Sequence, residues 1–148
     1  MNLNELTIPK NIIIKIKINE CRKLIFTEST DTPSPYVVAI VKDEKFTTQV
    51  FYDQQNPVFA TGCNFSLKLP LSELKFLKII FEVWHKNPFY KKDIIIGQYA
   101  VDAYKIYGES SHEKTNLWGN LDNNNYNVGS ISLDILVISE GDKTTALI

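Results

Sequence analysis

Residues 12–18 read IIIKIKI, and this stretch decides the fold of the chain. The isoleucines at its even-numbered positions share one face, while Lys15 and Lys17 share the opposite face. A two-residue period of β-branched and charged side chains is typical of a strand with one buried face. Ile13 alone departs from the alternation. We therefore expect a half-buried β-strand near the start of the chain.

Further strand patterns follow at short, roughly regular intervals. The segments that alternate are residues 65–69, 77–83 and 131–137, the continuous apolar run is 36–41, and 45–52 and 94–101 also read as strands. Turn-forming Pro, Asn and Asp residues separate them at 32–35, 56–57, 87–88 and 122–127. Helices are expected only as short turns within residues 71–77 or 101–107. Seven or eight short strands indicate an all-β fold, an antiparallel β-sandwich.

Composition limits the class of protein. The 148 residues suit one domain, with 44% hydrophobic and 22% charged residues, which is ordinary for a globular fold. A formal net charge of −1 argues against a general nucleic-acid binder. The sequence contains neither an apolar run long enough to span a bilayer nor a recognisable secretory signal. Cys21 and Cys63 are therefore expected to be reduced thiols in a cytoplasmic protein.

The sequence lacks the motifs that mark common enzymes. We find no Gly-x-Ser-x-Gly elbow, no Gly-x-x-x-x-Gly-Lys phosphate loop and no His-Glu-x-x-His pair. The two histidines, His85 and His112, lie in separate predicted loops without an obvious catalytic partner. We therefore expect a binding module rather than an enzyme.

Several motifs in the same order resemble the C2 domain, the membrane-targeting β-sandwich of protein kinase C, synaptotagmins and ferlins. The pieces that carry the resemblance are residues 12–24, Pro33-Ser34-Pro35-Tyr36-Val37, Asn56-Pro57-Val58-Phe59, Phe81-Glu82-Val83-Trp84 followed by Asp93-Ile94-Ile95-Ile96-Gly97, Leu117-Trp118-Gly119-Asn120-Leu121 and Gly129-Ser130-Ile131-Ser132-Leu133. The resemblance implies eight antiparallel strands in the circularly permuted type II topology. Residues 107–121 are most similar to ferlin modules. We expect an N-terminal extension (1–11), the C2 domain (12–138) and a polar C-terminal tail (139–148).

The resemblance also implies a possible calcium site, but this sequence has few of the carboxylate ligands that such a site needs. Calcium requires six to eight oxygen ligands, several of them carboxylates. Ser34, His85 and Asn87 stand where calcium-binding members have aspartates. The remaining candidate ligands are Glu28, Asp31 and Asp93. We therefore expect no cofactor, and calcium binding that is weak or absent.

The predicted loop of residues 85–92 carries the main functional signal. It combines Lys86, Lys91 and Lys92 with two adjacent aromatic residues, Phe89 and Tyr90. Lysines are attracted to anionic headgroups, and aromatic rings settle at the membrane interface. We predict peripheral binding to anionic phospholipid membranes, in a module of a membrane-trafficking or fusion protein. The rings fit equally well folded back onto the sandwich.

A protein-interaction domain without lipid affinity is the alternative hypothesis. An exposed apolar patch or sheet edge would recruit the partner, and candidates include the surroundings of Tyr104, Tyr107 and Trp118. A second basic site on a sheet face is not expected, because its lysines alternate with acidic residues. Those lysines are Lys42, Lys45, Lys68 and Lys78.

Overall fold

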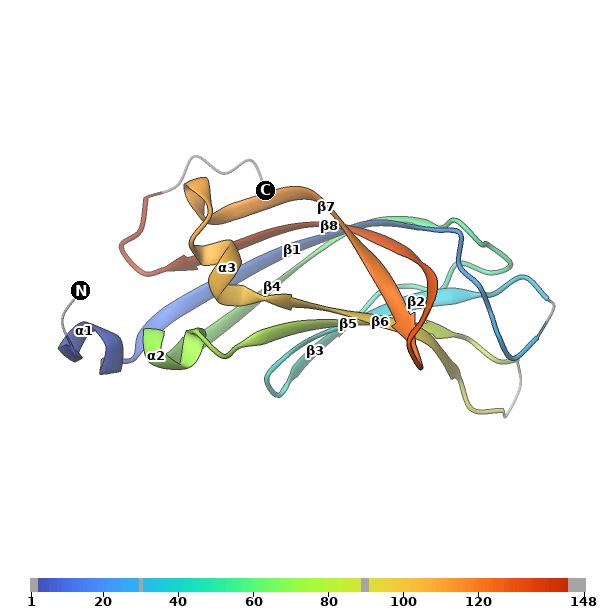
Figure 1. The fold of residues 1–148 in the computed structure, drawn as a ribbon, viewed down its shortest axis with the longest axis horizontal. Helices are drawn as coiled ribbons and strands as arrows, with labels where there is room; N and C mark the ends of the chain where they lie inside the picture. The colour runs from blue at the N-terminus through green and yellow to red at the C-terminus, as the bar shows by residue number, and fades with distance from the viewer. Residues whose placement is uncertain (1–2, 30, 89–90, 144–148) are drawn as a thin grey trace.

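The computed structural model describes residues 3–29, 31–88 and 91–143, which fold into an all-β domain (Figure 1). Eight antiparallel strands form within this part of the chain: β1 (Lys10–Arg22), β2 (Pro35–Val41), β3 (Glu44–Thr47), β4 (Val58–Leu69), β5 (Lys78–His85), β6 (Ile94–Asp102), β7 (Glu113–Asn123) and β8 (Tyr126–Ser139). The helical elements are short: α1 (Leu3–Thr7), α2 (Leu71–Leu74), α3 (Ala103–Tyr107) and the 3₁₀ turn η1 (Ser110–His112). The two helical turns predicted from the sequence are thus confirmed as α2 and α3.

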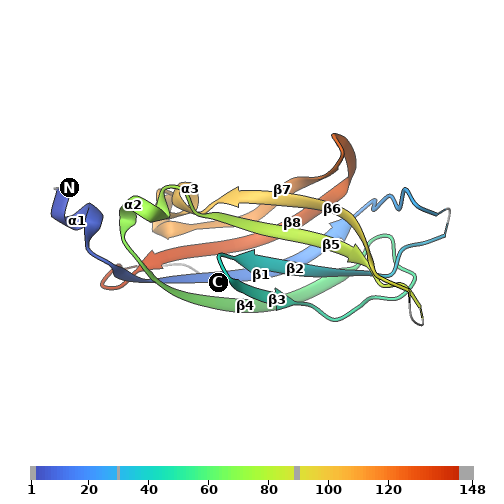
Figure 2. The same ribbon diagram turned by 90° about the horizontal axis from the view of Figure 1, so that it is seen from below.

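The hydrogen-bonded strand order is β3-β2-β5-β6-β7-β8-β1-β4. The only paired residues between β6 and β7 in the described chain are Gln98 and Asp122. The ladder therefore folds over at this point into two four-stranded layers (Figures 1 and 2). The last strand, β8, lies between β7 and the first strand, β1, which confirms the expected type II order.

The core lies between the two layers, and the side chains that the alternating pattern predicted to be buried fill it. The four even-numbered isoleucines of β1 are at most 2% exposed, and the inward-facing residues of β8 are fully buried. On the opposing layer, alternate side chains of β2 and β5 face the core, including Val37, Ile79 and Phe81. Both cysteines are free thiols, as expected.

Two strand boundaries differ from the sequence prediction. The strand expected over residues 45–52 ends at Thr47. Beyond it, the side-chain hydroxyl of Thr48 takes the place of a backbone acceptor, because it accepts the Val37 N–H at 2.9 Å and donates to the Gln49 carbonyl at 3.0 Å. The strand expected over 65–69 begins earlier, at Val58, because β4 pairs with β1 along nearly its whole length. A shift of register between Ile18 and Glu20 accommodates the positive φ of 46° at Ala60.

The strand ends bring three loops together at one end of the molecule. Pro35 at the start of β2 pairs with His85 at the end of β5, which also pairs with Ile94 at the start of β6. The β1–β2 loop joins the β3–β4 loop through a hydrogen bond from the Leu24 N–H to the Gln55 carbonyl, 3.2 Å long. We refer to residues 23–34, 48–57 and 86–93 as the first, second and third top loops.

A matched pair of phenylalanine substitutions tests this core. Phe81→Ala is expected to lower the free energy of unfolding by about 3–5 kcal/mol, because Phe81 is fully buried and its removal leaves a cavity. Phe76→Ala, at a residue that is 83% exposed, should change it by less than about 0.5 kcal/mol. Chemical denaturation followed by circular dichroism measures both, and equal losses would contradict the layer assignment.

Candidate functional site: the top-loop cleft

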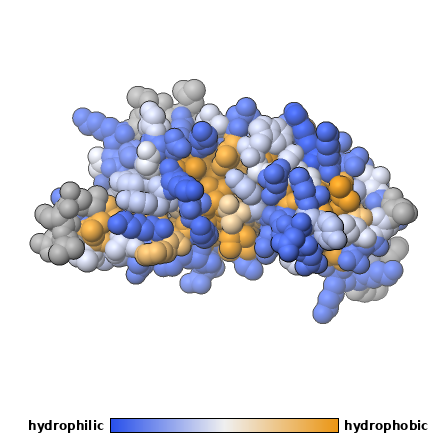
Figure 3. Space-filling view, viewed as in Figure 1, coloured by the Kyte–Doolittle hydropathy of each residue, from blue (hydrophilic) through white to orange (hydrophobic). Residues whose placement is uncertain are grey.

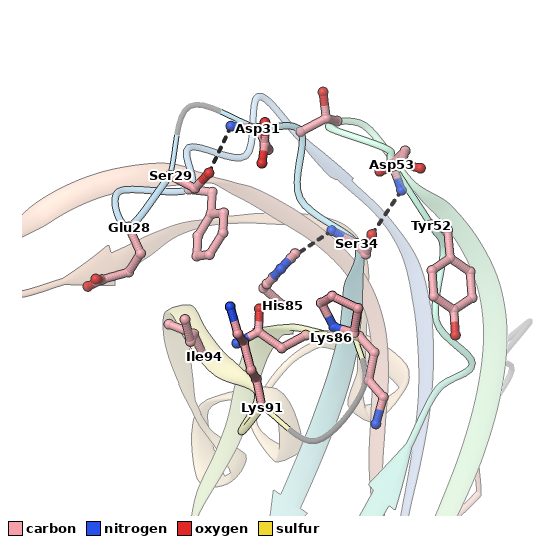
Figure 4. Close-up of a pocket in the computed structure, with 14 residues that line it drawn as sticks. Glu28, Ser29, Asp31, Ser34, Tyr52, Asp53, His85, Lys86, Lys91 and Ile94 are labelled. Carbon is pink, nitrogen blue, oxygen red and sulfur yellow. Dashed lines mark hydrogen bonds between the residues drawn. The ribbon is translucent and has the colours of Figure 1, made fainter.

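The three top loops enclose an open cleft of about 1010 Å³ (Figure 4). Each loop contributes to its wall, so the cleft exists only because the strand ends converge. The lining residues include Phe26, Glu28, Ser29, Asp31, Tyr52, Asp53, Lys86, Asn87 and Lys91 around a floor formed by Ser34 and His85.

Ser34 ties the three loops to one another at the floor of the cleft. Its N–H donates to His85 Nδ1 at 3.0 Å, and its carbonyl accepts the Lys86 N–H at 2.9 Å. Its hydroxyl accepts the Asp53 N–H at 3.0 Å. Ser34 is 7% exposed and His85 is 9% exposed, so these bonds are shielded from water. Buried polar groups that are fully paired rigidify the segments they join.

His85 is also held by an aromatic contact. The ring of Phe26 lies over the imidazole, with ring centroids 4.3 Å apart and an interplanar angle of 30°. Because Nδ1 accepts a hydrogen bond, the neutral imidazole carries its proton on Nε2. The position that resembles a metal-ligating aspartate in sequence is therefore occupied by a packed, hydrogen-bonded ring.

Asp93 at the end of the third loop has a full set of partners. Its Oδ2 accepts from the Tyr36 hydroxyl at 2.6 Å and lies 3.6 Å from Lys86 Nζ, and its Oδ1 accepts the Asn87 N–H at 3.0 Å. Burial acts to raise the pKa of Asp93, but these hydrogen bonds and the Lys86 charge outweigh it and hold the pKa below 3.8.

The same contact changes the acidity of the tyrosine. Burial, followed by the hydrogen bond and negative charge of Asp93, raises the pKa of the Tyr36 phenol well above its ordinary value of 10.0. The phenol therefore remains a hydrogen-bond donor throughout the accessible pH range. Tyr36 and Asp93 together close the base of the third loop onto β2.

Carboxylates lie on all three top loops. Glu28 and Asp31 line it from the first loop, and Asp53, which the sequence analysis did not single out, lines it from the second. Asp93 is engaged by Tyr36, Asn87 and Lys86. Within residues 3–29, 31–88 and 91–143, no three His, Cys, Asp or Glu side chains gather in a group able to hold a metal.

The predicted membrane-binding residues fall partly within the described chain. Lys86 and Lys91 line the cleft, and Lys92 is exposed on the same loop. The Lys92 carbonyl accepts a hydrogen bond from the Asn87 side chain, 2.5 Å long, which closes this part of the loop. Phe89 and Tyr90, also predicted to bind membrane, lie outside the described residues. The cleft thus has lysines on its third-loop side and carboxylates on the other two loops.

Comparisons with known proteins agree with this architecture. Residues 13–121 match the family model of the C2 domain. The chain is similar to a C2 domain of a plant extended synaptotagmin 1 (13% identity, TM-score 0.72, 88% of this chain and 96% of that one). It is also similar to human GIVD cytosolic phospholipase A2 (17% identity, TM-score 0.69, 94% of this chain and 18% of that one).

A third similar structure is a fragment of extended synaptotagmin 2 that contains an SMP domain followed by two C2 domains (14% identity, TM-score 0.71). The alignment covers 88% of this chain and only 28% of that fragment. No curated protein sequence matches the chain significantly. Among the described residues, no helix has the length and apolarity needed to cross a bilayer.

Substitution of Asp93 tests its structural role in the third loop. Asp93→Asn should lower the free energy of unfolding by about 1–2 kcal/mol at neutral pH, because a charged acceptor of several hydrogen bonds is lost. The folded-state pKa of Asp93 lies below the ordinary 3.8, so this stabilisation is fully present above pH 3.8 and is lost as the pH falls through the lower, folded-state pKa. Denaturant unfolding at a series of pH values should show the two proteins converging in acid.

Asp31→Asn is the matched control, because Asp31 is exposed and none of the described hydrogen bonds uses its carboxylate. A constant difference between wild type and Asp93→Asn across the acid range would contradict the assigned role.

Proposed function

This chain belongs to the C2 domain family, and from that premise we propose that it binds anionic phospholipid membranes peripherally through its top loops. The observation that carries the proposal is the lysine-rich third loop. Lys86 pairs with Asp93, whereas neither Lys91 nor Lys92 forms an ion pair with any described residue. Two exposed ammonium groups beside an open cleft are suited to phosphate-bearing headgroups.

The expected strength of this attachment is modest. A lysine near an anionic surface contributes about 1 kcal/mol, so the two unpaired lysines provide about 2 kcal/mol before any contribution from Lys86 or the aromatic residues. Such binding is reversible and becomes effective when several modules are linked in one protein. We therefore propose a role as one membrane anchor of a larger trafficking or fusion protein, with the ferlin-like resemblance of residues 107–121 as support.

Calcium independence, or weak calcium dependence, is part of the same proposal. The hydrogen bonds of Ser34 and His85 join the loops without a metal ion, and the described carboxylates do not converge on one point. Lys86 and Lys91 also line the cleft, and their positive charges oppose a bound cation. We infer a constitutive, non-catalytic membrane module that acts at the cytoplasmic face.

Protein interaction without lipid binding remains the alternative. Of the aromatic residues suggested by the sequence, Trp118 and Tyr104 are partly exposed, and Tyr107 is stacked between Tyr104 and His112. Arg22 lies over the Trp118 ring at 4.7 Å, so one face of that ring is covered by the chain itself. A stronger observation for an interaction surface is the outer face of β2 and β5, described below.

Charge reversal on the third loop tests the membrane proposal. Lys91→Glu with Lys92→Glu should weaken binding to phosphatidylserine-containing vesicles at least thirtyfold, since about 2 kcal/mol of attraction is lost. Vesicle sedimentation in EGTA and in calcium measures the effect, and wild type should bind similarly in both. Adding Phe89→Ala should weaken binding further if that ring contributes.

Lys17→Glu with Lys68→Glu provides the matched control, because both lysines are exposed on the strands of the other layer. Unchanged vesicle binding by the third-loop variant would place the membrane contact elsewhere. Strict calcium dependence would contradict the proposed calcium independence. Failure of wild type to bind any vesicle would favour the protein-interaction alternative.

A further inference from the structure

The outer face of β2 is apolar, and the adjoining face of β5 alternates Ile80 and Trp84 with Lys78 and Glu82. The burial of both strands alternates, so Val38, Ile40 and Ile80 point away from the core. None of the three belongs to the core cluster or to the partly buried residues packed against it. Paired positions place Ile40 beside Ile80, and Tyr36 beside Trp84 on the same face. These side chains form an apolar stripe, which we call the outer stripe. One carboxylate interrupts it, because Glu82 lies between Ile80 and Trp84, opposite Val38, and accepts a hydrogen bond from Trp84 Nε1 at 3.3 Å.

The sequence of β2 indicates that this stripe is covered in the functional state. β2 reads PYVVAIV and is apolar at both its inward and its outward positions. Continuous apolar strands are typical of sheets covered on both faces, whereas half-exposed strands alternate with polar residues. The layer that contains β4 shows the alternation of a half-exposed strand, because the outward positions of β4 include Asn64, Ser66 and Lys68.

Charged residues flank the outer stripe with opposite signs. Lys45 on β3 lies beside Ile40 on one edge. Asp122 on β7 lies at the other edge, paired with Gln98 of β6, and Glu82 on β5 lies within the stripe between Val38 and Gln98. None of these three charges forms an ion pair with a described residue, whereas the neighbouring Lys42 and Lys78 pair with Glu73 and Asp102.

A shallow hollow adjoins the carboxylate edge. It measures about 290 Å³ and is lined by Ile80, Gln98, Tyr99, Ala100, Asn120 and Asp122. Figure 3 shows the side that carries α3, β6 and β7, with hydrophobic residues reaching the surface in its middle and hydrophilic residues around them. The hollow combines an aliphatic wall with a carboxylate, which suits the stem and ammonium group of a lysine.

We propose that two copies of this chain pair face to face through the outer stripe. A two-fold axis that runs parallel to the strands along the stripe brings the lysine edge of one copy over the carboxylate edge of the other. The face is therefore self-complementary, as an isologous interface requires. Ile40 of each copy packs against the stripe of the other copy. Lys45 of each copy enters the hollow of the other, beside Asp122, and approaches Glu82 of that copy. Sheets packed in this way lie about 10 Å apart.

This symmetry has a consequence for the top loops. Rotation about an axis parallel to the strands leaves both copies pointing in the same direction along it. Both sets of top loops therefore lie at one end of the dimer, where they can reach a single surface. A weakly binding module gains avidity when two copies engage the surface together.

The oligomeric state in solution tests the proposal. Sedimentation velocity across an approximately hundredfold range of protein concentration should show the wild-type chain moving from monomer to dimer. Ile40→Glu should abolish the dimer, because it adds a second carboxylate to the stripe and replaces the aliphatic contact with Ile80. Ser66→Glu is the matched control on the exposed outer position of β4, and it should dimerise like wild type. Circular dichroism checks that each variant is folded.

A charge exchange tests the symmetry itself. Lys45→Glu and Glu82→Lys should each weaken dimerisation at least tenfold, and the double variant should recover most of that loss. A wild-type chain that stays monomeric throughout, including one that binds a different protein through this face, would overturn the proposal. It would also be overturned by a dimer that survives Ile40→Glu, or by a double variant that is no better than the single ones.

Discussion

The burial of one face of β1 is the constraint on which the rest of this structure depends. β1 pairs with β8 on one side and with β4 on the other, and its four even-numbered isoleucines fill the centre of the core. A slip of one residue in either register would turn all four toward solvent. The registers of three long strands are therefore set together, and with them the end of the molecule at which the top loops meet.

Hydrogen bonds and an aromatic contact join the loops at that end. Ser34 uses its N–H, carbonyl and hydroxyl to reach residues of the second and third loops, while Phe26 covers His85 from the first loop. Asp93 is engaged by Tyr36, Asn87 and Lys86. These contacts hold the loops together around the cleft, where Lys86 and Lys91 face the carboxylates of the other two loops. The two proposed surfaces, the top loops and the outer stripe, lie on different parts of the same rigid scaffold.

Much of the fold could be predicted from the local sequence pattern, and particular residues show which features could not. The alternation of β1, β5 and β8 predicted which side chains are buried, because period two maps directly onto the two faces of a sheet. The end of β3 at Thr47 was missed, because it depends on a hydrogen bond between the Thr48 hydroxyl and a residue of β2. The role of Asp53 in the cleft was missed for a related reason, since only folding brings the second loop beside the other two.

By itself, the sequence determined the all-β class, the strand faces, the order of the C2 motifs and the loop in which three lysines flank two aromatic residues. These properties depend on the spacing of residues along the chain, which folding does not alter. Only the tertiary structure decided that Ser34 and His85 bond to each other, that Asp93 is held by Tyr36, and that Lys45 and Asp122 flank one apolar stripe. Each of these relations joins residues on different strands or loops, and their proximity arises only when the two layers close over a common core.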